Sequence, residues 1–224
     1  NDQFTGTFQA KINGGAPITG DLSKGTYGIK INIQGEDAGH FLRSAGVLDN
    51  IRGGMLKLEL EPAQRNGYYT GGFVIDKLHM LHSNPIASIL DSLSLIGLLN
   101  KLENEGIQFH QAKGWLNITP EGIQLRDVSL IGLSMGLSLN GWYAKNTKTV
   151  DFEGVITPIY AINGVFERIA GKLFGEQKGE GLFSFVYTMK GPTDAPKVRV
   201  QPLSILTPGA FRKLFRSDIP EPKK

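Results

Sequence analysis

The sequence predicts a mainly β protein: a long, curved antiparallel meander sheet that forms a groove, with three or four helical segments at its edges and over one face. Three observations support this fold class. Apolar and polar residues alternate with a period of two along most of the 224 residues. The breaks between these runs are short and rich in glycine, proline and asparagine, which favours hairpins between antiparallel neighbours. Only a few stretches have the spacing of an amphipathic helix.

Four alternating runs in the first 80 residues predict strands at residues 4–12, 27–34, 55–61 and 68–78. A short helical segment at residues 38–48 separates the second run from the third, and Asp37 is its predicted N-cap. Asn66 and Gly67 supply a turn signal between the third and fourth runs. This part of the chain therefore predicts hairpins with one intervening helix.

A helical region is predicted between Asn84, as its cap, and Gly106, as its stop, with Pro85 at the first helical position. The sequence fits either a helical hairpin or one long helix. Beyond Gly97 the segment is apolar nearly all round its axis. Two interpretations follow: the helix is wedged between the sheet and another element, or it contacts lipid.

The central prediction is one long strand at residues 130–143, which would span roughly 40 Å at about 3.3 Å per residue. Small residues, including Gly132, Ser134 and Gly136, would line one side of this strand, and large apolar residues would line the other. Burying its large side chains would contribute on the order of 10 kcal/mol, so something must cover them. That apolar side carries Ile131, Leu133, Met135, Leu137 and Leu139.

Further strands are predicted at residues 107–118, 123–128, 151–157, 181–190 and 197–201, and a helix at 164–175, giving roughly ten strands in all. We expect one domain at residues 1–216 and a flexible tail at 217–224. Residues 208–216 form a basic amphipathic stretch that either contacts a membrane surface or caps the end of the sheet. Its predicted membrane-contact residues are Phe211, Arg212, Lys213, Leu214 and Phe215.

Composition argues against several classes of protein. A formal net charge of +3 with scattered basic residues gives no reason to expect nucleic acid as a partner. The absence of cysteine excludes disulfides, thiol catalysis and cysteine-based zinc sites. No run reaches the roughly 18 apolar residues of a membrane span. Because the sequence starts with Asn1 and not with methionine, we expect a fragment or a processed product, and a lost N-terminal anchor stays an open alternative.

The motifs of the sequence do not predict an enzyme. Residues 132–136 match the G-x-S-x-G pattern of serine hydrolases, but no helix follows Ser134, so catalysis by this serine is only a remote alternative. His79 and His82 lie three residues apart without a cysteine or repeated carboxylate partner nearby. We therefore predict no catalytic residues, no metal site and no cofactor.

Several stretches, in order and spacing, resemble the C-terminal module of bacterial AsmA-like proteins, the group that includes YhdP and TamB. The resemblance covers most of the chain. It rests on residues 37–42 (Asp-Ala-Gly-His-Phe-Leu), 53–54, 84–85, 95–99, 105–107, 154–163 (Gly-Val-Ile-Thr-Pro-Ile-Tyr-Ala-Ile-Asn), 179–183, 190–192, 195–198 and 201–209 (Gln-Pro-Leu-Ser-Ile-Leu-Thr-Pro-Gly).

The resemblance implies a non-enzymatic periplasmic module of a larger protein, tethered to the inner membrane by a segment outside this chain. It implies transfer of phospholipid toward the outer membrane, with acyl chains, the inner or outer membrane and the rest of an AsmA-like chain as partners. The alternative is a docking or assembly module in outer-membrane biogenesis. The residues expected to line a lipid groove are Ile131, Leu133, Met135, Leu137, Leu139, Phe183 and Phe185.

Overall fold

A computed structural model describes residues 5–158 and 184–202. Its strands are β1 (Thr5–Lys11), β2 (Pro17–Lys24), β3 (Ile29–Gly35), β4 (Ile51–Arg52), β5 (Met55–Pro62), β6 (Tyr69–Met80), β7 (Ile107–Ile118), β8 (Gly122–Gly132), β9 (Met135–Ala144), β10 (Thr149–Pro158), β11 (Phe185–Pro192) and β12 (Lys197–Pro202). Its helices are α1 (Ala38–Ser44), α2 (Asn84–Ser92) and α3 (Ile96–Asn104).

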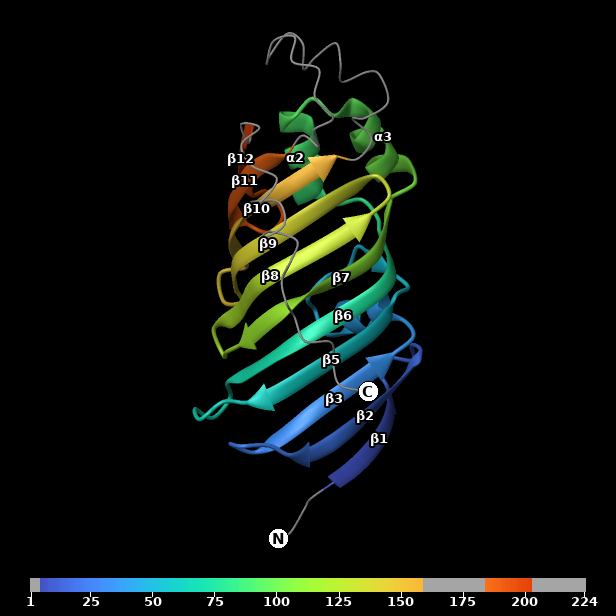
Figure 1. Cartoon of the computed structure of the whole chain (residues 1–224), viewed down its shortest axis with the longest axis vertical. Coiled ribbons are helices and arrows are strands. Elements are labelled where there is room, and N and C mark those ends of the chain that lie inside the picture. Colours follow the sequence, from blue (N-terminus) through green and yellow to red (C-terminus); the bar gives the residue numbers. More distant parts are fainter. Residues whose placement is uncertain (1–4, 159–183, 203–224) are drawn as a thin grey trace.

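The twelve strands form one open, curved antiparallel sheet, which confirms the predicted fold class (Figure 1). Eleven of them follow one another across the sheet in sequence order, and the short β4 pairs with β6 beside this path. Each strand on this path pairs with the one before it, and the connections that the structure describes are hairpins or helical segments. The topology is therefore a meander, with β1 and β12 as the outermost strands among the described residues.

The sequence prediction missed β2. We expected a single strand before residue 27, whereas residues 17–24 form a second strand that pairs with both β1 and β3. Gly20 interrupts its pattern of large apolar side chains, but the gap is filled because the Phe8 ring lies over Gly20. The missing side chain in β2 is thus compensated from the neighbouring strand.

Helix α1 begins as predicted at Asp37, whose carboxylate accepts a hydrogen bond from the His40 backbone N–H at 2.8 Å. Such a cap satisfies a donor that the first helical turn leaves unpaired. The helix packs tightly on β4, because Gly39 lies against the Ile51 backbone. Together α1 and β4 cover part of one face of the sheet near β6.

The predicted helical region is a hairpin, the first of the two alternatives. Its two helices, α2 and α3, are separated by a turn in which Ser94 adopts a left-handed φ of 54°. The N-cap is Ser83 rather than Asn84, and Pro85 remains in the first helical turn, where its missing N–H costs nothing. Helix α2 lies against β12 at the far end of the sheet (Figure 1).

The predicted single strand at residues 130–143 is wrong: the chain turns back on itself between Gly132 and Met135, and β8 and β9 are two paired strands. A two-residue turn brings the residues on either side of it opposite each other, on the same face. Even-numbered residues of β8 such as Leu130 therefore share a face with odd-numbered residues of β9 such as Leu137, with which Leu130 pairs. Ile131 pairs with Gly136 and lies on the opposite face.

Two irregularities shift the alternation inside strands. Lys77 in β6 and Asp127 in β8 have left-handed φ values of 57° and 49°. The Asp127 backbone N–H bonds the Asn140 side chain at 2.8 Å, where the β8–β9 register shifts. Such bulges flip the following side chains to the other face. As a result, the apolar residues before and after each irregularity lie on the same face, although the apolar–polar alternation in the sequence shifts by one residue there.

Several predictions lie outside the described residues. These are the helix at residues 164–175, the start of the strand at 181–190, the membrane-contact segment at 208–216 and the tail at 217–224.

Candidate functional site

One face of the sheet carries apolar side chains in continuous rows that run across the strands. Directly paired residues of adjacent strands share a face, so the register defines each row. The inner row consists of Ala10, Ile18, Gly35, Leu56, Ile75, Ala112, Leu130, Leu137, Ile156 and Phe185. The outer row consists of Gly6, Leu22, Ile31, Leu60, Gly71, Leu116, Leu125, Gly141, Phe152, Met189 and Val198.

Neither row contains a single polar side chain. With about 4.8 Å between neighbouring strands, the outer row extends over roughly 48 Å from Gly6 in β1 to Val198 in β12. The hydrocarbon region of one membrane leaflet is about 15 Å thick, half that of the bilayer. The apolar row is therefore about three times as long as the hydrocarbon thickness of one leaflet, which is the distance that a lipid tail spans.

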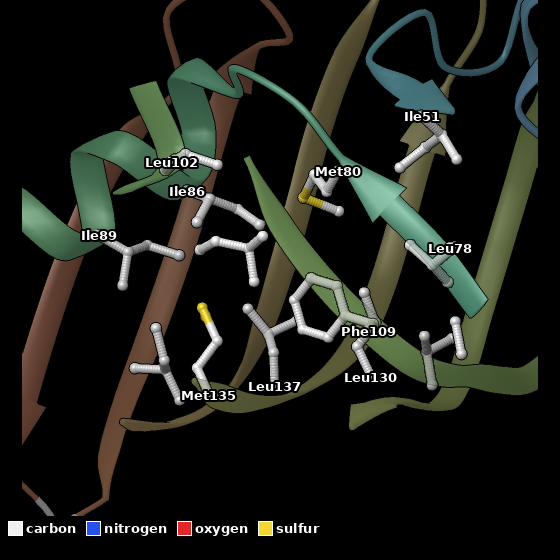
Figure 2. Packing of buried hydrophobic residues seen from close by; sticks show 14 of the residues in the cluster. Ile51, Leu78, Met80, Ile86, Ile89, Leu102, Phe109, Leu130, Met135 and Leu137 are labelled. Carbon is white, nitrogen blue, oxygen red and sulfur yellow. The ribbon is translucent and has the colours of Figure 1, made fainter. Parts of the chain in front are cut away.

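The inner part of this face is sealed where α2 and α3 cover it. Figure 2 shows Ile86, Ile89 and Leu102 of these helices above Met135 and Leu137 of the sheet. Met135 is 0% exposed and Leu137 is 5% exposed. Such burial is typical of a close-packed core.

Tyr187 brings one polar group into this sealed region. Its hydroxyl donates a hydrogen bond to the Ser138 carbonyl at 2.8 Å, and Gly154 opposite leaves room for it. Burial raises the pKa of the Tyr187 phenol well above its usual range. The phenol is therefore held neutral as a hydrogen-bond donor.

A second cover lies near the middle of the sheet, where α1 and β4 pack. Ala38 and Ile51 are almost fully buried there. Gly54 lies so close to Ile75, Leu78 and Ala38 that it leaves no room for a side chain. This cover also shields the inner row.

The outer part of the face is more exposed. The described helices lie mainly against β4, β6 and β12, away from the centre of the outer row. We call the half-buried apolar residues of this region the open tract: Phe8, Leu22, Ile31, Ile33, Leu58, Leu60, Phe73, Leu116, Leu125, Leu139, Phe152, Val198 and Val200. Large apolar surfaces on a folded domain mark interaction sites.

The structure separates the residues that we expected to line a groove. Ile131 is 41% exposed on the opposite face, and Leu133 is 73% exposed in the β8–β9 turn, so neither belongs to the apolar rows. Met135, Leu137 and Phe185 do lie on the apolar face, but they are buried. Of the six predicted residues that the structure describes, Leu139 alone belongs to the open tract. Phe183 lies outside the described residues.

Sequence reasoning missed most of the open tract, although its signal was present. Leu58, Leu60, Leu116, Leu125 and Phe152 each belong to a predicted strand, but the prediction concentrated on a single stretch. A row can be recognised only when the pairing register between several neighbouring strands is known. The two-residue turn and the bulges change which residues face each other, and the sequence alone does not show these changes.

The opposite face of the sheet is mainly polar, although it also carries Val74, Trp115, Trp142 and Val155. At its β1 end it has a hollow of about 460 Å³, beside the side chains of Thr7, Thr19 and Asp21. At the other end its small polar residues are buried: the Thr157 and Ser184 hydroxyls lie 2.7 Å apart in a hydrogen bond, whereas the buried Ser129 hydroxyl has no hydrogen-bond partner among the described residues. The sheet therefore has one oily and one mainly polar face, as expected for a strand period of two.

Ser134 lies in the tight β8–β9 turn and not, as expected, on an unbroken strand. A serine-hydrolase elbow connects a strand to a helix, whereas this turn connects two antiparallel strands. The Ser134 hydroxyl is buried and accepts a hydrogen bond from Lys101 Nζ at 3.3 Å.

Two of the four histidines make ring contacts typical of structural residues. The His40 ring bonds the Ile12 carbonyl at 2.6 Å and thus ties α1 to the β1–β2 turn. The His79 ring bonds the Glu105 carbonyl at 2.7 Å. Within residues 5–158 and 184–202, no group of histidine and acidic side chains is arranged to hold a metal ion.

None of the helices that the structure describes is long and apolar enough to span a membrane. No protein-family model matches the chain, and the comparisons with curated proteins and with solved structures found no match either.

Proposed function

We propose that the chain is a non-enzymatic module that binds phospholipid acyl chains along the open tract. It would act as part of a larger AsmA-like protein, tethered to the inner membrane and projecting into the periplasm, that moves phospholipid toward the outer membrane. The observation that carries this proposal is the outer row, which crosses eleven strands without a polar side chain.

The physical basis is the burial of methylene groups. Each methylene group removed from water contributes about 0.8 kcal/mol, so ten of them against the tract would contribute about 8 kcal/mol before the costs of binding. The partial exposure of residues such as Leu60 and Leu116 leaves one side accessible to a tail. Movement along the tract needs no cofactor, because each position offers the tail a similar apolar surface.

Native mass spectrometry of the purified chain tests the proposal. We expect complexes whose added mass corresponds to one or more phospholipids, and extraction with organic solvent should recover those lipids. A chain that carries no lipid, and takes none up from phosphatidylethanolamine and phosphatidylglycerol vesicles, would contradict it.

A docking or assembly module is the second candidate, and the sealed half of the face favours it. There α2 and α3 cover Met135 and Leu137 with the chain's own side chains. In that role the remaining apolar surface would pack against a protein. The two candidates differ in whether lipid copurifies with the isolated chain.

A further inference from the structure

β1 and β12, the outermost strands of the sheet in the described part of the chain, differ in chemistry. The edge strand β12 carries Lys197 and Arg199, ends with Pro202 and lies beside α2. Charges, proline and a covering helix are the devices by which proteins prevent an edge strand from pairing with another chain. The β12 edge is thus protected.

The edge strand β1 lacks these devices. Among the described residues its only paired neighbour is β2. Its seven residues contain no proline and a single charge, on Lys11 at one end. The Phe8 ring leans inward over Gly20 and so does not obstruct the outer edge. Within residues 5–158 and 184–202, no strand pairs with the backbone groups on that edge, so among these residues the edge is a template for a partner strand.

The apolar rows also reach β1 without a terminating polar residue. Gly6, Phe8 and Ala10 lie on the apolar face and are half-buried, whereas Thr7 and Gln9 are exposed on the polar face. A further strand paired with β1 would cover the side of these apolar residues that faces away from β2. Its polar side chains would lie beside the hollow near Asp21.

We propose that the outer edge of β1 binds an extended partner segment by strand addition. The chemistry of β1 defines this segment: alternate residues are apolar and continue the rows, and the residues between them are polar, with a basic one fitting near Asp21. The backbone ladder would supply affinity and the alternation would supply specificity. This inference is independent of lipid binding, because it depends only on the edge.

Hydrogen–deuterium exchange with a synthetic peptide tests it. The probe is a nine-residue peptide in which valine and leucine alternate with threonine and lysine, added at about 1 mM. If its dissociation constant is about 0.1 mM, exchange of the β1 amides should slow about tenfold. Amides of β12 should be unaffected. The control is a peptide of the same sequence whose backbone nitrogens are methylated, so that it has no N–H donors for a ladder on either edge. It should give no protection.

A matched pair of variants locates the partner's apolar side. Ala10→Lys places a charge on the apolar face at the edge, and should reduce the protection at least fivefold. Gln9→Lys, on the neighbouring residue and the polar face, should leave it intact. Circular dichroism of both variants checks that the sheet is retained.

Three outcomes would overturn the proposal. The first is protection of β12 instead of β1. The second is equal protection by the N-methylated peptide, which would mean adhesion without a ladder. The third is protection of β1 that rises with protein concentration in the absence of peptide, together with a dimer in sedimentation, because the edge would then be occupied by a second copy.

Discussion

A carboxylate in the open tract should abolish lipid binding while leaving the fold intact. Leu116 is a suitable position because it lies in the outer row between Gly71 and Leu125 and is half-buried. Fully burying a leucine contributes about 1.5–3 kcal/mol, so losing this half-buried one should cost about 1–2 kcal/mol of unfolding free energy. In the Leu116→Asp protein the carboxylate remains in contact with water on the exposed side of this position. The full free-energy cost of burying an unpaired charge therefore does not apply.

The effect on lipid should be larger. A hydrated carboxylate would displace about three methylene groups of a tail from the tract. At about 0.8 kcal/mol each, the loss is about 2.4 kcal/mol, which corresponds to about fiftyfold weaker binding. Displacement of a fluorescent phospholipid measures the affinity, and thermal unfolding of the same sample measures the stability.

Asn117→Asp is the matched control, because it introduces a carboxylate at the next residue but on the polar face. Its oxygen can still accept the 2.8 Å hydrogen bond from Thr70, and only its donation to Gln124 is lost. This variant should bind lipid like the parent. Equal lipid affinity of the Leu116→Asp and Asn117→Asp proteins would refute the assignment of the open tract.

Three further predictions concern the sealed region and the serine. Met135→Asp should destabilise the domain by about 4 kcal/mol or more, because its carboxylate would be stranded beneath α2 and α3; a denaturation midpoint like the parent's would show that this region is open. The pKa of Tyr187 is raised in the folded state, so the unfolded chain loses that proton first, and stability should fall as pH rises above about 10; Tyr187→Phe should lessen this loss, and an unchanged pH dependence would count against it. Ser134→Ala should lower stability by less than about 1 kcal/mol and change no hydrolytic activity; an esterase activity that disappears in this variant would establish catalysis.

The sequence predicted the class of fold because alternation and turn residues are local signals. Asp37 as a cap and the hairpin at Asn66-Gly67 depend on a few neighbouring residues, and both lie where expected. The β8–β9 turn has no such signal: Leu133 and Ser134 contain neither glycine nor asparagine, and the alternation continues through them. A strand and a two-residue hairpin therefore look alike in this stretch.

The site was less predictable than the fold, for a tertiary reason. Met135 and Leu116 are both apolar residues of amphipathic strands, and only the position of α2 and α3 makes one sealed and the other partly exposed. The phase shifts at Lys77 and Asp127 further decide which residues share a row. These features depend on how distant segments pack, which local periodicity does not encode.

Photocrosslinking shows which residues of the sheet contact lipid tails. The purified chain is incubated with vesicles of a phospholipid that carries a diazirine in its acyl chain, irradiated and digested, and the labelled residues are identified by mass spectrometry. We predict labels on open-tract residues such as Ile31, Leu60, Leu116 and Leu125, with few on the polar face. Labels spread equally over both faces, or confined to residues outside the open tract, would contradict the proposal that this surface holds lipid tails.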